Sequence, residues 1–291
     1  MENDILKKVR RVEIKTRGLS REIFAGKYHT AFKGRGMAFS EVREYRQGDD
    51  VRDIDWNVTA RARSPYIKLY EEERELTMML LIDVSGSGAF GTQTMYKRQL
   101  ATEIAAVIAF SAASNNDKVG AIFFTDKVEK YVPPKKGRQH VLRIISDLID
   151  FKPENKGTDI GSALQFFAGV QKKRSTAFIL SDFIDGGKLA TTDSYILSIA
   201  ASKHDLVALR LYDKREEELP NVGIVELRDA ETGKKEWVDT SSKRTRREYA
   251  ENYRQLCEAI TKTLSSKKID NIAIATDEDY VMSLIKLFKM R

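Results

Sequence analysis

The sequence lacks the paired cysteines and the long apolar runs that mark many secreted and membrane-spanning proteins. Its single cysteine, Cys257, cannot form an internal disulfide or a thiolate metal cluster. No apolar run approaches the roughly 20 residues that a helix needs to cross a bilayer, so we expect no membrane insertion. The first eight residues include acidic side chains and no apolar segment, unlike a secretory signal. These absences predict a cytoplasmic protein.

Histidine is also scarce, which limits the enzyme mechanisms open to the chain. The three histidines are His29, His140 and His204, and none follows a predicted strand beside the polar loop at Asp83. A general base of the kind that activates a nucleophile is therefore missing. The phosphate-binding pattern G-x-x-x-x-G-K-[ST] is absent as well. The sequence therefore favours a binding protein over an enzyme.

Charge of one sign is not concentrated along the chain. The net charge of +7 comes from 50 basic and 43 acidic residues, which interleave almost everywhere. Mixed runs such as Lys214–Glu218 are typical of a solvated face. The strongest basic cluster, Lys243–Arg247, is followed by Glu248 and Glu251 and has no bracketing aromatic residues that could stack on bases. Nucleic-acid binding is therefore kept only as an alternative function.

Apolar runs and amphipathic stretches alternate from about Leu76 onward. The first run, Leu76–Ile82, is nearly continuous, as expected of a central strand that is buried on both faces. Apolar residues then recur at helical spacing between Met95 and Ala113. Further strands are predicted at Val119–Phe124, Val128–Val132 (ended by Pro133 and Pro134), Ala177–Leu180, Leu206–Leu211 and Ile272–Ala275. The alternation predicts an α/β fold with a doubly wound, mostly parallel sheet.

The length of 291 residues favours one main domain with an appendage. Residues 1–75 do not show this alternation of strands and helices. Alternating apolar and polar residues around Ala38–Val42 and Ile67–Leu69 predict a small, mainly β N-terminal appendage. Trp56 is expected to lie in the local core of this appendage. Residues 76–291 form the predicted main domain. Within it, two short apolar stretches flank the turn-like Ala230–Gly233, which predicts an inserted β-hairpin near residues 221–240.

Five residues with side-chain oxygen atoms follow predicted strands or open a predicted helix. In open α/β sheets, ligands bind at the carboxyl ends of the strands. Two carboxylates and three hydroxyls suit a hard ion such as Mg²⁺, Mn²⁺ or Ca²⁺ and discriminate against zinc. The sequence therefore predicts a divalent-cation site, with Mg²⁺ as the first candidate, formed by Asp83, Ser85, Ser87, Thr158 and Asp182.

A metal site at this position requires the chain to curl between Asp83 and Ser87. On an extended strand these two residues would lie about 13 Å apart. Two ligands of one magnesium ion lie at most about 4.2 Å apart. Gly86 and Gly88 are expected to permit the curl, because glycine adopts positive φ without a Cβ penalty and allows close backbone approach.

Two alternatives to a metal site stay open for these residues. The first is structural: Asp83 ends a strand, Ser85 and Ser87 are turn residues, and Thr158 caps a helix with Asp159 in its first turn. The second is a magnesium-dependent, phosphatase-like hydrolase, because haloacid dehalogenase-like phosphatases keep their nucleophilic aspartate at the end of a first strand. Those enzymes need a second aspartate two residues later, where this chain has Ser85.

The set of five residues resembles the metal-ion-dependent adhesion site of von Willebrand factor A domains in spacing and in order. More narrowly, the stretches Gly34–Phe39, Arg43–Asp49 and Arg52–Trp56 are similar to the hallmark segment of the bacterial domain-of-unknown-function family fifty-eight. One departure is Gly88, where many such sites carry methionine, although this is not a ligand position. The resemblance implies a von Willebrand factor A-like main domain behind a family-specific appendage.

For function, the resemblance implies a protein binder and not an enzyme. By analogy, the three hydroxyls would contact the metal ion, and the two carboxylates would bind it directly or through water. A glutamate or aspartate from a protein partner would complete the coordination shell. The family is similar to proteins that work beside MoxR-type AAA+ ATPases in a chaperone-like or assembly role, so such an ATPase is the expected partner. The residues expected to face the partner are Gly86, Gly88 and Asp159.

Overall fold

The chain divides into two compact units, one formed by Phe32–Leu76 and the other containing Thr77–Arg291. The computed structural model describes residues 38–62, 64–71, 76–91, 95–189, 191 and 193–291. Residues 1–37 lie outside the described residues, and with them Gly34 and Gly36 of the family-like stretch. The predicted appendage of residues 1–75 is therefore seen only from Ala38 onward.

The smaller unit contains a two-stranded antiparallel sheet and two short helices. The strands are β1 (Ala38–Glu44) and β2 (Tyr66–Glu71), and the helices between them are η1 (Val51–Asp53) and α3 (Trp56–Ala62). The strands fall where alternation predicted them. The expectation that Trp56 belongs to a local core is wrong, because its side chain is 67% exposed. It opens a seven-residue helix that has no buried residues.

The larger unit is built on a six-stranded sheet in the order β10-β7-β6-β3-β4-β5. Neighbouring strands are parallel, except that β5 runs antiparallel to β4. From β3 the chain passes first to β4 and later returns to β6 on the other side, so the strand order reverses beside β3. The predicted fold class is therefore confirmed. The strands are β3 (Thr77–Asp83), β4 (Lys118–Phe124), β5 (Val128–Lys135), β6 (Thr176–Ser181), β7 (Asp205–Tyr212) and β10 (Asp270–Ala275).

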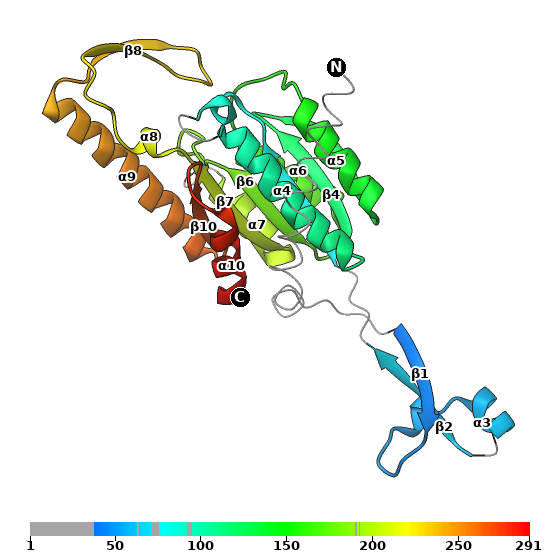
Figure 1. Cartoon of the computed structure of the whole chain (residues 1–291). Helices are drawn as coiled ribbons and strands as arrows, with labels where there is room; N and C mark the ends of the chain where they lie inside the picture. The colour runs from blue at the N-terminus through cyan, green and yellow to red at the C-terminus, as the bar shows by residue number, and fades with distance from the viewer. Residues whose placement is uncertain (1–37, 63, 72–75, 92–94, 190, 192) are drawn as a thin grey trace. The chain divides into compact units, whose positions relative to one another are not determined.

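Helices cover both faces of this sheet (Figure 1). Met79 and Leu81 of β3 join a core with helices α6 (Ile160–Val170), α7 (Ser194–Lys203) and α9 (Lys243–Ser266). The alternate residues of β3 point to the opposite face, where helices α4 (Lys97–Ser114), α5 (Arg138–Asp150) and α10 (Tyr280–Met290) pack. Because β3 is buried on both faces, its apolar run is continuous. Within the described residues, no helix combines the length and apolarity needed to span a membrane.

One predicted strand end is wrong. β5 does not end at Val132 but continues through Pro133 and Pro134 to Lys135. It is an edge strand of the sheet, where a residue without a backbone donor is tolerated. Gly120 of β4 lies opposite, and a Cβ at this position would come within 2.9 Å of the Pro134 nitrogen. The edge strand therefore packs closely on the backbone of β4.

The predicted hairpin is confirmed. Its strands are β8 (Ile224–Arg228) and β9 (Lys235–Asp239), which pair antiparallel. The Asp229 carboxylate shapes the turn between them by accepting hydrogen bonds from the backbone nitrogens of Glu231 and Thr232, at 2.8 and 2.9 Å. Gly233 completes the turn at φ +71°. A short helix that was not predicted, α8 (Lys214–Glu217), lies between β7 and the hairpin.

His204 is a buried histidine between α7 and β7. It is 2% exposed, its Nδ1 lies 3.2 Å from the Ser175 hydroxyl, and its ring packs against Phe167 at 4.4 Å. Within the part of the chain that the structure describes, its Nε2 atom has no hydrogen-bond partner. Burial, and to a smaller degree the nearby Lys203 and Arg174, lowers the pKa of His204 below its ordinary value.

Acidification is expected to destabilise the protein through His204. The unfolded chain keeps the ordinary pKa near 6.5 and binds a proton before the folded chain does. The contribution of His204 to the free energy of unfolding should therefore fall between about pH 7 and about pH 5, by at most about 1.4 kcal/mol per pH unit. Raised carboxyl pKa values such as that of Asp83 act in the opposite direction, so the test is the difference between two proteins. In chemical denaturation, the free energy of unfolding should decrease less, or increase more, from pH 7 to pH 5 in His204→Gln than in the wild type. Equal pH dependence in the wild type and His204→Gln would contradict the prediction.

Candidate metal-ion site

The loop after β3 brings three of the predicted ligands together. Asp83 ends β3, and the chain turns directly into the short helix η2 (Gly86–Ala89). The Asp83 carboxylate accepts a hydrogen bond from the Ser85 backbone nitrogen at 2.9 Å. The Ser85 and Ser87 hydroxyl oxygens lie 3.1 Å apart. The curl that the metal-site prediction required is therefore present.

The prediction for the glycines of this loop is half right. Gly86 and Gly88 do not adopt positive φ, because a turn of 3₁₀ helix makes the curl. The predicted close backbone approach is present at Gly86, where a Cβ would lie 2.4 Å from the carbonyl oxygen of Ala230, in the turn of the hairpin. The loop Asp83–Ser87 and the hairpin turn are thus in direct contact.

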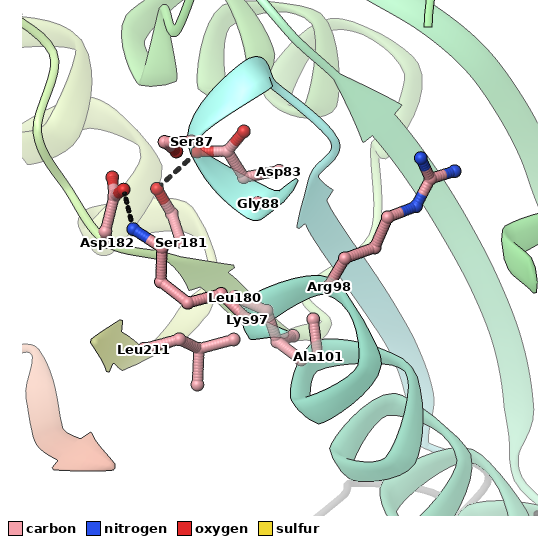
Figure 2. A pocket seen from close by; sticks show the side chains of 10 residues that line it. All are labelled: Asp83, Ser87, Gly88, Lys97, Arg98, Ala101, Leu180, Ser181, Asp182 and Leu211. Atoms are coloured by element: carbon pink, nitrogen blue, oxygen red, sulfur yellow. Dashed lines mark hydrogen bonds and ion pairs between the residues drawn. The ribbon is translucent and has the colours of Figure 1, made fainter. Parts of the chain in front are cut away.

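Asp182 joins the loop from the adjacent strand. It follows β6, which pairs in parallel with β3, so the carboxyl ends of the two strands meet. Ser181 donates a hydrogen bond of 2.6 Å to the Asp83 carboxylate. Burial, together with the negative charge of Asp182, raises the pKa of Asp83 to about 7. Figure 2 shows Asp83, Ser87 and Asp182 around a cavity of about 20 Å³, which has room for one water-sized species.

Thr158 reaches the site less directly. It is buried in the loop before α6, but the N-cap of that helix is Asp159, whose carboxylate accepts from the Ser162 nitrogen at 2.7 Å. The alternative that Thr158 caps the helix is therefore wrong. Among the described residues, no hydrogen bond joins Thr158 to the other four predicted ligands. Its hydroxyl donates instead to the Glu231 carboxylate at 2.6 Å.

A buried lysine, missed by the sequence analysis, balances part of the negative charge. Lys97 opens α4 and is 3% exposed, and its Nζ lies 2.7 Å from Asp182 and 2.6 Å from Glu216. Burial by itself lowers the pKa of Lys97, but the two carboxylates outweigh it and raise the pKa. Lys97 is therefore charged. Figure 2 shows its amine directed at Asp182, whereas Arg98 points away and donates to the carbonyl oxygen of Phe151.

The donors fit a hard divalent cation. Within the described residues, no three His, Cys, Asp or Glu side chains form a cluster that could hold a metal ion, so binding would depend on the hydroxyls as well. Neighbouring ligands of an octahedral magnesium ion lie about 3.0 Å apart, close to the 3.1 Å between the hydroxyls of Ser85 and Ser87. Burial also raises the pKa values of Glu216 and Glu231, and Asp182 adds to both. The carboxyl groups near Asp182 are therefore harder to ionise than free ones, and a divalent cation would favour their ionised form.

Four contributing residues escaped the sequence analysis. Lys97 and Ser181 carry no motif that marks them, although Ser181 directly precedes Asp182. Glu216 lies in the mixed-charge run that was interpreted as a solvated face, and this interpretation is wrong for Glu216. The spacing of Glu216 from Asp213 is that of a capping box, which could have predicted α8 but not the contact with Lys97. Glu231 was interpreted only as part of a turn.

Comparisons with known proteins identify the family. The model of the family "Protein of unknown function DUF58" matches residues 41–258. The chain belongs to this family. The uncharacterized protein Rv1480 of Mycobacterium tuberculosis is 36% identical to it over 203 residues, which are 69% of this chain and 62% of that relative. The chain thus aligns with less than two thirds of the length of this relative.

Solved structures share the fold of the larger unit. BatB from Bacteroides thetaiotaomicron aligns at a TM-score of 0.50 and 15% identity, over 74% of this chain and 98% of BatB. An aerotolerance-related membrane protein from Bacteroides fragilis aligns at 0.51 and 16%, over 74% and 100%. A von Willebrand factor type A protein from Catenulispora acidiphila aligns at 0.38 and 12%, over 77% and 43%. The two Bacteroides structures therefore share the fold of this chain, and its assignment to the von Willebrand factor A type stays a prediction.

Proposed function

We propose that this DUF58 protein is a metal-dependent protein-binding module and not an enzyme. The observation that carries the proposal is the meeting of Asp83, Ser85, Ser87 and Asp182 beside a cavity for one water-sized species. The site lies where the strand order reverses, the usual ligand position in such sheets. The two aspartates would balance the charge of a divalent ion, with Mg²⁺ the first candidate and Mn²⁺ or Ca²⁺ the others.

The proposed partner is a protein that presents an acidic side chain. An octahedral ion has six ligand positions, and in this proposal the two aspartates, the two serines and Thr158 would occupy five of them, directly or through water. A glutamate or aspartate from the partner would take the sixth. The family resemblance makes a MoxR-type AAA+ ATPase the first partner to test, in an assembly or chaperone-like role. A cytoplasmic location stays a prediction.

Metal binding is tested by titration calorimetry with Mg²⁺ and Mn²⁺. We expect one ion per chain, and at least about a tenfold loss of affinity in Asp83→Ala and Ser85→Ala, since removal even of groups that only orient a ligand costs about 10- to 100-fold. Ser198→Ala is the matched control, because its hydroxyl donates to the carbonyl oxygen of Ser194 in its own helix α7. Equal affinity of the wild type and both site variants would refute the metal site.

The interaction is tested with a purified MoxR-type ATPase from the same genome. Binding measured by interferometry should require Mg²⁺, disappear on addition of EDTA and be lost in Asp83→Ala. Binding whose affinity changes neither on addition of EDTA nor in Asp83→Ala would count against a metal-bridged contact. Magnesium-dependent hydrolysis of p-nitrophenyl phosphate that is lost in Asp83→Ala would instead support the phosphatase-like alternative.

A further inference from the structure

The turn of the β8–β9 hairpin lies on the candidate metal site. The Glu231 carboxylate accepts a 2.6 Å hydrogen bond from Thr158, one of the five predicted ligands. The neighbouring carbonyl of Ala230 lies so close to Gly86 that a Cβ there would clash with it. The turn is therefore held against the site by two contacts, one with the loop that contains Thr158 and one with the loop that contains Gly86. The hairpin follows α8 and precedes α9 in the chain (Figure 1).

We infer that Glu231 is this chain's own acidic ligand for the metal, and that a partner's carboxylate must displace it. This inference rests on the proposed function, since it assigns the sixth ligand position of the same site. In the closed form, the hairpin turn supplies the carboxylate that an external protein supplies in the bound form. The hairpin thereby competes with the partner for one ligand position.

The contact distances suit two ligands of one ion. Neighbouring ligands of an octahedral magnesium ion lie about 3.0 Å apart, and the Thr158 and Glu231 oxygens lie 2.6 Å apart without the ion. The Ser85 and Ser87 oxygens form a second pair, at 3.1 Å. Glu231 is also near enough to Asp182 for the two charges to affect one another. A cation between them would relieve that repulsion.

The rest of the hairpin supports a docked and releasable turn. Alternate side chains of β8 are exposed, and four of the five residues of β9 are exposed. A two-stranded hairpin without a covered face has little stability of its own in water. The Asp229 hydrogen bonds hold the turn in a shape that presents Glu231. The turn is therefore preformed, and its contacts with the site can be broken without unpacking the core of the sheet.

The test compares the wild type, Glu231→Gln and Glu236→Gln by Mn²⁺ titration with water-proton relaxation as the readout. Glutamine keeps an oxygen that can accept from Thr158 but loses the charge, so the variant separates a structural hydrogen bond from metal ligation. Glu236 is the matched control, an exposed glutamate of the same hairpin. Circular dichroism shows that each variant is folded, and Glu231→Ala serves as a second variant.

If Glu231 is a ligand, Glu231→Gln should bind Mn²⁺ about tenfold more weakly, in line with the loss of one coordinating or orienting group. In Glu231→Ala, which removes the ligand oxygen altogether, each bound Mn²⁺ should carry an additional water and relax water protons faster, and acetate should reverse this gain in the variant but have no effect on the wild type. Glu236→Gln should match the wild type. Wild-type Mn²⁺ affinity in both Glu231 variants, together with wild-type relaxation in Glu231→Ala, would overturn the inference and leave the proposed function standing. Absence of Mn²⁺ binding to the wild type would overturn the proposed function itself.

Discussion

Replacing Lys97 by methionine is expected to lower the free energy of unfolding by about 3 to 5 kcal/mol in metal-free buffer, the cost of removing one partner of a buried ion pair. Lys97 contacts both Asp182 and Glu216, at 2.7 and 2.6 Å, and its own side chain is only 4% exposed. Methionine fills a similar volume but leaves the buried Asp182 carboxylate and the half-buried Glu216 carboxylate without their cation. The loss comes from those unpaired charges and not from poorer packing.

Urea denaturation followed by circular dichroism measures this effect. Tryptophan fluorescence would report it poorly, because Trp56 and Trp237 are 67% and 70% exposed. The matched control is Lys127→Met, which breaks an exposed pair with Glu154 and should cost about 1 kcal/mol or less. A loss below about 1 kcal/mol in Lys97→Met as well would contradict the assigned role of this lysine.

If the proposed site is correct, magnesium should reduce the loss of unfolding free energy that Lys97→Met causes. A divalent ion beside Asp182 would supply the positive charge that the substitution removes. Because an ion that binds only the folded state stabilises it by mass action, the variant should gain more stability from excess Mg²⁺ than the wild type does. Equal gains in the two proteins would show that Lys97 and the ion do not act on the same carboxylates.

The sheet could be predicted because a buried strand requires a run of apolar residues that are neighbours in the sequence. β3 is buried on both faces, so its apolar run is continuous and its end at Asp83 is visible without any tertiary information. Asp182 could be placed beside Asp83 for the same reason, since both aspartates follow buried parallel strands. The end of β5 was predicted too early although its edge position was expected, because two consecutive prolines were interpreted as a strand end, whereas an edge strand tolerates residues without a backbone donor.

The charge balance of the site could not be predicted, because it depends on residues that are far apart in the chain. Lys97 and Glu216 are separated by 119 positions, and Thr158 and Glu231 by 73. Neither α8 nor the hairpin turn has a periodic pattern that fixes its position against the sheet. Mixed-charge runs are usually solvated, and only the fold shows that Glu216 is an exception.

Replacing Phe178 by alanine is expected to destabilise the protein by about 3 to 5 kcal/mol, the usual cost of emptying a large aromatic site in a core. Phe178 lies in β6, opposite Leu80 of β3 and Val207 of β7, and none of its surface is exposed. Its ring meets Phe288 of α10 edge-on, with centroids 6.3 Å apart. Two strands and a helix surround the side chain, so the cavity has little room to collapse.

Phe178→Leu separates loss of volume from loss of the aromatic contact and should cost less than Phe178→Ala. Tyr195→Ala, which truncates an aromatic side chain that is 74% exposed on α7, should stay within about 0.5 kcal/mol of the wild type. If Phe178→Ala changed the free energy of unfolding by equally little, the core between β6 and α10 would have to be loosely packed. Because β6 ends at Ser181, directly before Asp182, Phe178→Ala should also weaken Mn²⁺ binding more than Tyr195→Ala does, which titration of both folded variants would measure.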